Sequence, residues 1–184
     1  MKNSRFYQVF LEYIQDLYDA EQQIVISLPA MIQAATNDEL KSGFTEHLGE
    51  TKEQVKRLER IFNLLGEQPK AKTCQAMKGL IAEGKEILQK SGLTPAVRDC
   101  FIIICAQKIE HYEISAYGSA YALAKHIQAV SSDKQIFKEI CKLFDETLQE
   151  EGHADKKLTK VAEGKLFFNG VNDELEEELK AYKF

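Results

Sequence analysis

The sequence predicts an all-α protein built on four long helices that pack as one bundle. Apolar residues recur at alternating spacings of three and four in four long segments, which is the pattern of a helix with one buried face. Strand signals are nearly absent, since the β-rich run at residues 101–105 lies inside a longer helical period. A length of 184 residues suits one domain with a substantial hydrophobic core.

Helix start and stop signals divide the chain into four long helices and two short ones. Asn37 and Asp38 are both good N-caps, and Gly66 is a good C-terminal stop. Thr94 followed by Pro95 has the pattern of an N-cap and the first helical residue. We therefore expect helices at residues 5–35, 37–66, 74–89, 94–126, 131–163 and 171–182.

The lengths of the connections predict how the long helices are joined. The first two are separated by a short link, and so are the last two, which makes antiparallel neighbours. The long connection at residues 67–93, which carries the shorter helix, can cross the bundle. This is the connectivity of ferritin-like four-helix bundles, so we predict such a bundle at residues 1–165 and a helical extension at 166–184. Pro29 lies inside the first helix, where we expect a kink.

Each long helix interrupts its apolar stripe with carboxylates near the middle. On the first helix the pattern runs Leu17, Glu21, Ile24, so one acid replaces one apolar residue. The polar members of the four stripes are Glu21; His47, Glu50 and Gln54; Glu110 and Glu113; and Glu151 and Asp155. When neighbouring helices are antiparallel and joined by short links, the polar middles of their stripes lie at the same level along the bundle. Six carboxylates and one imidazole are therefore expected to converge.

Such a cluster predicts a site for two metal ions. Burying unpaired carboxylates costs several kcal/mol for each group, and no Lys or Arg lies on these stripes to neutralise them. Two divalent or trivalent ions resolve the electrostatics, because carboxylates can both ligate and bridge metals. The predicted ligands are Glu21, His47, Glu50, Glu110, Glu113, Glu151 and Asp155.

Blander interpretations stay open for single residues. A lone glutamate on a helix is commonly solvated, and His47 alone would suit a hydrogen-bonded core histidine. Tyr117, one turn beyond Glu113, either hydrogen-bonds a ligating carboxylate or packs as a core phenol. His111, His126 and His153 fall away from the stripes and are expected on the surface.

Composition and charge exclude several classes of function. The net charge of −5 without a dense basic run argues against binding nucleic acid. No apolar run approaches the ~20 residues of a membrane span, and because Glu12 and Asp16 soon follow the start, we do not expect a secretory signal there. The four cysteines form no Cys-x-x-Cys pair, so reduced thiols in a cytoplasmic protein are expected.

Five motifs resemble one known family. They are DLYDAEQQ at 16–23, HLGETKEQV at 47–55, CQAMKGLIAE at 74–83, AQKIEHYEISAYG at 106–118 and LQEEGHADKKL at 148–158. In this order they resemble the YciF/YciE family of bacterial ferritin-like proteins (domain of unknown function 892), over residues 5–163. The resemblance implies a rubrerythrin-like bundle, a cytoplasmic location, a homodimer and a role in the stress response. It implies no known reaction, and catalytic residues stay unassigned.

The ligand pattern departs from that of ordinary di-iron proteins. Those carry Glu-x-x-His on two helices, whereas here His47-x-x-Glu50 is reversed and Glu110 is followed by Glu113. A shell rich in carboxylates and poor in histidine favours hard ions, iron in the first place and manganese as the alternative. Three functions remain: a redox enzyme that reacts with oxygen or peroxide, a metal-binding protein without turnover, and a structural stress protein with a polar core.

Overall fold

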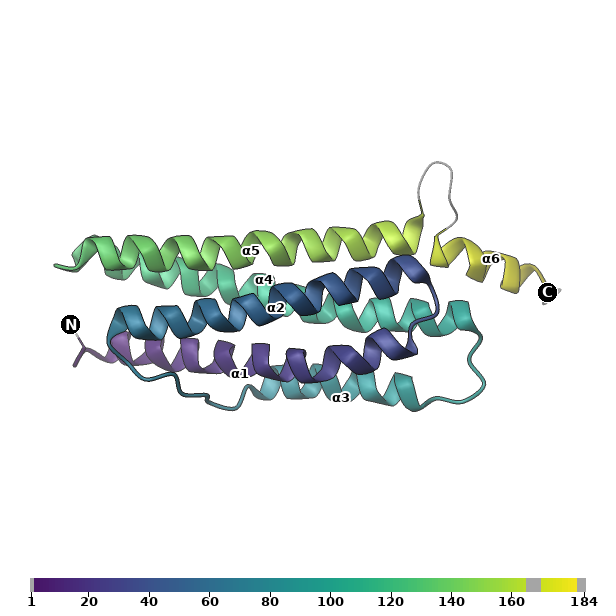
Figure 1. Ribbon diagram of the computed structural model, residues 1–184, viewed down its shortest axis with the longest axis horizontal. Helices are drawn as coiled ribbons and strands as arrows, with labels where there is room; N and C mark the ends of the chain where they lie inside the picture. Colours follow the sequence, from purple (N-terminus) through teal and green to yellow (C-terminus); the bar gives the residue numbers. More distant parts are fainter. Residues whose placement is uncertain (1, 165–169, 182–184) are drawn as a thin grey trace.

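A computed structural model describes residues 2–164 and 170–181, which form six helices and no strand (Figure 1). The helices are α1 (Arg5–Ala34), α2 (Asp38–Leu65), α3 (Gln75–Gln89), α4 (Pro95–Val130), α5 (Lys134–Glu163) and α6 (Val171–Ala181). The all-α prediction is confirmed, and most boundaries agree within two residues. The exceptions are α4, which continues four residues beyond its expected end at residue 126, and α5, which begins three residues after residue 131.

The helix ends follow the capping signals. The Asn37 side chain accepts a hydrogen bond from the backbone N–H of Leu40 at 3.0 Å, which begins α2. Gly66 ends α2 with φ of 66°, a left-handed conformation that glycine adopts without a steric cost. α1 continues through Pro29 to Ala34, and the kink expected there stays a prediction.

Two helical hairpins, α1–α2 and α4–α5, make up the four-helix bundle (Figure 1). α2 packs against α5, and α1 packs against α4. The crossover helix α3 lies against α1 and α4 on one side of the bundle. α6 contacts α4 and α5; the domain boundary expected at residues 165–166 falls among residues that the structure does not describe and stays a prediction.

The core consists of two apolar clusters with a polar layer between them. One cluster contains Phe10, Phe137 and Phe144, each exposed by no more than 1%. The other contains Ile24 and Phe44 on the opposite side of the bundle's middle. Each fully buried side chain of this size contributes about 1.5–3 kcal/mol. The stabilisation therefore comes from the two ends of the bundle, which leaves the middle available for polar groups.

Asp99 is a buried acid whose hydrogen bonds are complete. Its carboxylate accepts from the backbone N–H of Thr36 at 2.8 Å, from the Thr36 hydroxyl at 2.6 Å and from the backbone N–H of Asn37 at 2.7 Å. These contacts fasten the turn between α1 and α2 to the start of α4. Asp99 thus shows the full set of hydrogen bonds that a buried carboxylate with a structural role makes in this fold, and the other buried acids can be compared with it.

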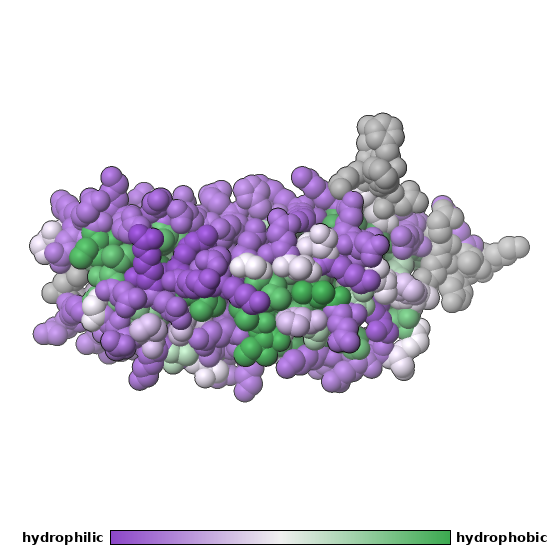
Figure 2. All heavy atoms as spheres, in the orientation of Figure 1, coloured by the Kyte–Doolittle hydropathy of each residue, from purple (hydrophilic) through white to green (hydrophobic). Residues whose placement is uncertain are grey.

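An apolar area lies on the surface near the middle of the bundle. Figure 2 shows hydrophobic residues gathered on the middle of the face where α1, α2 and α3 lie. Ile26, on α1, is 79% exposed. Among the residues described, no helix combines the length and the apolar character that a membrane crossing requires.

Candidate metal centre

Four ligand-type side chains from three helices meet in the polar layer. They are His47 of α2, Glu110 and Glu113 of α4, and Glu151 of α5. Each offers one nitrogen or oxygen atom, and these four atoms all lie within 4.8 Å of one another. The residues are exposed by only 5%, 2%, 1% and 0%, respectively. The arrangement can hold a metal ion out of contact with bulk water.

Glu21 brings a carboxylate from α1 to the same layer. It is fully buried, and one of its oxygens accepts a hydrogen bond from the hydroxyl of Tyr117. Its charge acts on Glu113, whose pKa it helps to raise. All four long helices therefore contribute to the polar layer. Tyr117 is both packed in the core and bonded to a candidate ligand, which resolves the two interpretations of the sequence.

Many polar atoms of this layer have no hydrogen-bond partner. They are Glu21 Oε2, His47 Nδ1 and Nε2, Glu110 Oε2, Glu113 Oε1 and Oε2, and Glu151 Oε2. A buried polar atom left unpaired costs about 1–3 kcal/mol, and a charged one costs more. A cation would satisfy these carboxylate oxygens and imidazole nitrogens, whose lone pairs face one another without a donor between them. The residues present therefore fit a metal centre.

The acid–base properties of the cluster reflect burial and crowding. Burial raises the pKa of Glu21 to about 7, against the hydrogen bond from Tyr117, which lowers it. Burial and the neighbouring charges of Glu151 and Glu21 raise the pKa of Glu113 well above its usual range. The pKa values of Glu110 and Glu151 are raised as well, chiefly by burial. Without metal, the cluster therefore binds protons that a bound cation would displace.

The imidazole of His47 lies between two carboxylates. Its Nε2 is 3.4 Å from Glu110 Oε1, and its Nδ1 is 3.5 Å from Glu50 Oε2. Burial lowers the pKa of His47, but the charges of Glu110, Glu50 and Glu21 outweigh that effect and raise it. Both nitrogens face carboxylate oxygens, but neither contact meets the geometry of a hydrogen bond.

Two predicted ligands, Glu50 and Asp155, lie at the rim and outside the compact group of four. The Glu50 side chain is 37% exposed, and Thr51 takes the buried position that the stripe assigned to Glu50. The Asp155 side chain is 20% exposed and accepts a hydrogen bond from Gln107 at 3.1 Å.

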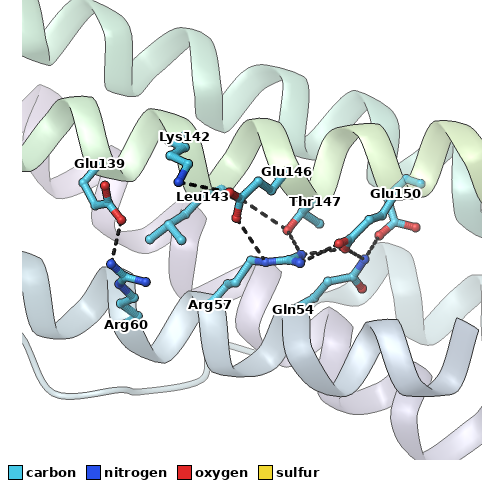
Figure 3. Close-up of polar contacts among 10 residues, drawn as sticks. Gln54, Arg57, Arg60, Glu139, Lys142, Leu143, Glu146, Thr147 and Glu150 are labelled. Atoms are coloured by element: carbon cyan, nitrogen blue, oxygen red, sulfur yellow. Dashed lines mark hydrogen bonds and ion pairs between the residues drawn. The ribbon is translucent and has the colours of Figure 1, made fainter.

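A polar network between α2 and α5 adjoins the cluster and was not predicted from the sequence (Figure 3). Arg57 donates to Glu150 at 2.5 Å and to the Thr147 hydroxyl at 3.1 Å. Gln54 donates to Glu150 at 3.1 Å and also to Glu151. The positive charge of Arg57 is therefore engaged by Glu150, and the buried carboxylates are not neutralised by it.

The remaining candidates lie where the sequence placed them. His111, His126 and His153 are exposed, although Nε2 of His111 is 3.3 Å from Asp155. All four cysteines fall within the described ranges and are free thiols; Cys100 is half-buried and the others are buried.

The chain is similar to known proteins over most of its length. It is 35% identical to protein YciF of Escherichia coli K12 over 91% of this chain and 93% of that protein. The crystal structure of this E. coli protein, described as a stress protein, matches with a TM-score of 0.77 at 34% identity, covering 85% of this chain and 94% of that one. YcfI of Rhodopseudomonas palustris matches with a TM-score of 0.79 at 37% identity, covering 86% and 96%.

These likenesses confirm the ferritin-like fold and the family that the motifs indicated. The family model described as "Domain of unknown function (DUF892)" matches residues 5–175, which include the four long helices and the first turn of α6. The chain belongs to the DUF892 family.

Proposed function

We propose that this chain is a di-metal carboxylate protein of the bacterial stress response, which reacts with oxygen or peroxide in the cytoplasm. The observation that carries the proposal is the set of buried oxygen and nitrogen atoms without partners in the polar layer. A protein that needed only a stable core would be expected to satisfy these atoms, as it does those of Asp99. The stress role is supported by the description of the E. coli relative as a stress protein.

The donor set favours iron, with manganese as the alternative. The proposed ligands are Glu21, His47, Glu110, Glu113 and Glu151, with Glu50 and Asp155 available at the rim. Oxygen ligands select hard ions, and one imidazole favours iron over calcium or magnesium. When bound, iron or manganese supplies one-electron redox chemistry toward oxygen or peroxide. The protein fixes the positions of the carboxylates and excludes water with the apolar clusters on either side.

The test is an anaerobic titration of the metal-free protein with Fe(II), followed by air and then by peroxide. We expect about two iron ions per chain, as in two-metal bundles, with absorbance changes on oxidation and consumption of peroxide. Two ions without turnover would favour a binding protein. Less than about half an equivalent, with no thermal stabilisation by iron or manganese, would leave a structural protein with a polar core.

We also propose a homodimer that forms through the exposed apolar area around Ile26. The groove beside Ile26 on α1 and α2 contains both signs of charge, Lys52 and Lys56 together with Glu53 and Glu59. In a two-fold pairing each patch meets its own copy, so one patch with both signs can complement itself. We expect Ile26→Asp to convert the dimer to a monomer in sedimentation equilibrium, while Val130→Asp, an equally exposed apolar site far from the groove, leaves it dimeric. A wild-type monomer at high concentration would contradict the proposal.

A further inference from the structure

A cavity between α2 and α5 leads to the candidate metal centre. Its volume is about 70 Å³, on a scale where one water molecule needs roughly 10–15 Å³, so it has room for a partly hydrated ion. Its walls are mostly apolar, from residues such as Phe44, Leu158 and Val161. Its polar lining includes His47 and Glu50, both part of the predicted ligand set. The cavity therefore joins the surface of the bundle to the polar layer.

Ligand atoms continue from this cavity into the cluster in short steps. The half-exposed Glu50 has Oε2 at 3.5 Å from Nδ1 of His47, and the other imidazole nitrogen is 3.4 Å from Oε1 of Glu110. Glu110 belongs to the buried group with Glu113. Exposure falls along this line from a rim carboxylate to fully enclosed ones. A cation can thus exchange one protein ligand for the next without crossing a purely apolar gap.

His47 provides an independent sign that the cavity serves a ligand. It lines the cavity, it is 5% exposed, and neither of its nitrogens has a hydrogen-bond partner. The imidazole's neighbours are the carboxylates of Glu50 and Glu110, at 3.5 and 3.4 Å, and a cation bound among these three groups would satisfy them better than these long contacts do. Its position between Glu50 and Glu110 suits a residue that a metal ion contacts on the way in and then keeps as a ligand.

We infer that the α2/α5 cavity is the route by which a divalent cation reaches the cluster, with Glu50 as its first ligand and His47 as its second. The inference rests on the proposed function, because it assumes that the cluster binds metal. It assigns Glu50 a transit role, which accounts for a predicted ligand lying at the rim.

The mouth of this cavity is narrowed by Lys157 of α5. Its ammonium group pairs with Glu46 of α2, and both side chains line the cavity. Gly43, on α2, lies beside this lysine, since a Cβ there would be in ordinary van der Waals contact with Lys157, 3.7 Å from its Cε. A larger side chain at position 43 would therefore fill the mouth, and the flexible end of Lys157 would shift to make room.

The experiment measures the rate at which the metal-free protein takes up Co(II), a probe that does not need oxygen, by stopped-flow visible absorbance. In Gly43→Leu we expect uptake to slow by about tenfold or more, equivalent to ~1.4 kcal/mol in the barrier, with the same Co(II) content at equilibrium. The matched control is Gly79→Leu, because Gly79 also lies inside a helix (α3), does not line the cavity and has open space around its Cβ position. Lys157→Ala should speed uptake several-fold, whereas Lys156→Ala, which removes the same charge one residue away, should not.

The outcomes separate the two proposals. Equal uptake rates in wild type, Gly43→Leu and Lys157→Ala would overturn the route and leave the metal centre standing. No Co(II) uptake by the wild type would overturn the metal centre and the route together. If Gly43→Leu fails to fold by circular dichroism, the comparison of Lys157→Ala with Lys156→Ala still decides.

Discussion

Replacing Glu113 with glutamine is expected to stabilise the metal-free protein while it weakens metal binding. Both oxygens of Glu113 are buried without a hydrogen-bond partner, and its pKa is raised by burial and by the charges of Glu151 and Glu21. Removing the ionisable group should therefore add about 2 kcal/mol to the free energy of unfolding without metal, which is roughly 4–8 °C in Tm for a chain of this size.

With metal the order of stability should reverse. A ligand present at 100 times its Kd adds about 2.7 kcal/mol to the wild type, and Glu113→Gln should lose most of that gain. The measurement is thermal unfolding with and without Mn(II), which avoids oxidation during the scan. A trade of stability for a ligand site is what distinguishes a functional carboxylate from a structural one.

Asp99→Asn is the matched control. It makes the same loss of charge at an equally buried position, but Asp99 accepts three hydrogen bonds that hold the α1–α2 turn. We expect it to lower the free energy of unfolding by about 2 kcal/mol and to leave the stabilisation by Mn(II) unchanged. If Glu113→Gln destabilised the metal-free protein as Asp99→Asn does, Glu113 would be a structural residue and the metal centre would lose its strongest support.

The long stripes could be predicted because helical periodicity alone determines which residues share a face. Glu21 interrupts a stripe that is apolar on both sides, so the same periodicity that buries Leu17 and Ile24 buries Glu21. Burial of an acid without a cation beside it in the sequence was enough to suggest a metal. The expectation that the acids of different helices converge needed one more step, the antiparallel packing that the short links between helices predict.

The position of Glu50 at the rim of the cluster could not be predicted, because helical periodicity does not decide whether Glu50 or Thr51 faces inward. Positions three and four residues after His47 lie on either side of the helix's inward direction, and contact with the neighbouring helix decides between them. In the folded chain Thr51 faces inward and donates to the carbonyl of His47 at 2.8 Å, while Glu50 faces the cavity mouth. The pairing of Arg57 with Glu150 could not be predicted from the sequence either, because it depends on the relative register of α2 and α5.

The metal-free protein should lose stability as the pH rises from about 4.5 to above 7. The pKa of Glu21 is raised by burial from its ordinary 4.5 to about 7, and those of Glu110, Glu113 and Glu151 are raised too. A group with a raised pKa binds its proton more tightly in the folded state, so its stabilisation is complete below its unfolded pKa and is lost as the pH rises through its folded pKa. Glu21 alone should account for about 3 kcal/mol of this loss.

Metal should abolish this pH dependence, because the cation replaces the protons. Each carboxylate that ligates must be ionised, so binding releases protons and strengthens as the pH rises. Urea unfolding at pH 4.5 to 8 should therefore give a falling free energy in chelator and a flat or rising one in excess Mn(II), while Glu21→Gln should have a shallower slope in chelator. Surface carboxylates with lowered pKa values, such as Glu12 beside Lys72, act in the opposite direction in all these samples and cancel in the comparison. A metal-free protein that became more stable over this range, by the same amount with and without Glu21, would mean that water or protein donors already satisfy the buried acids, and the cluster would then need no metal.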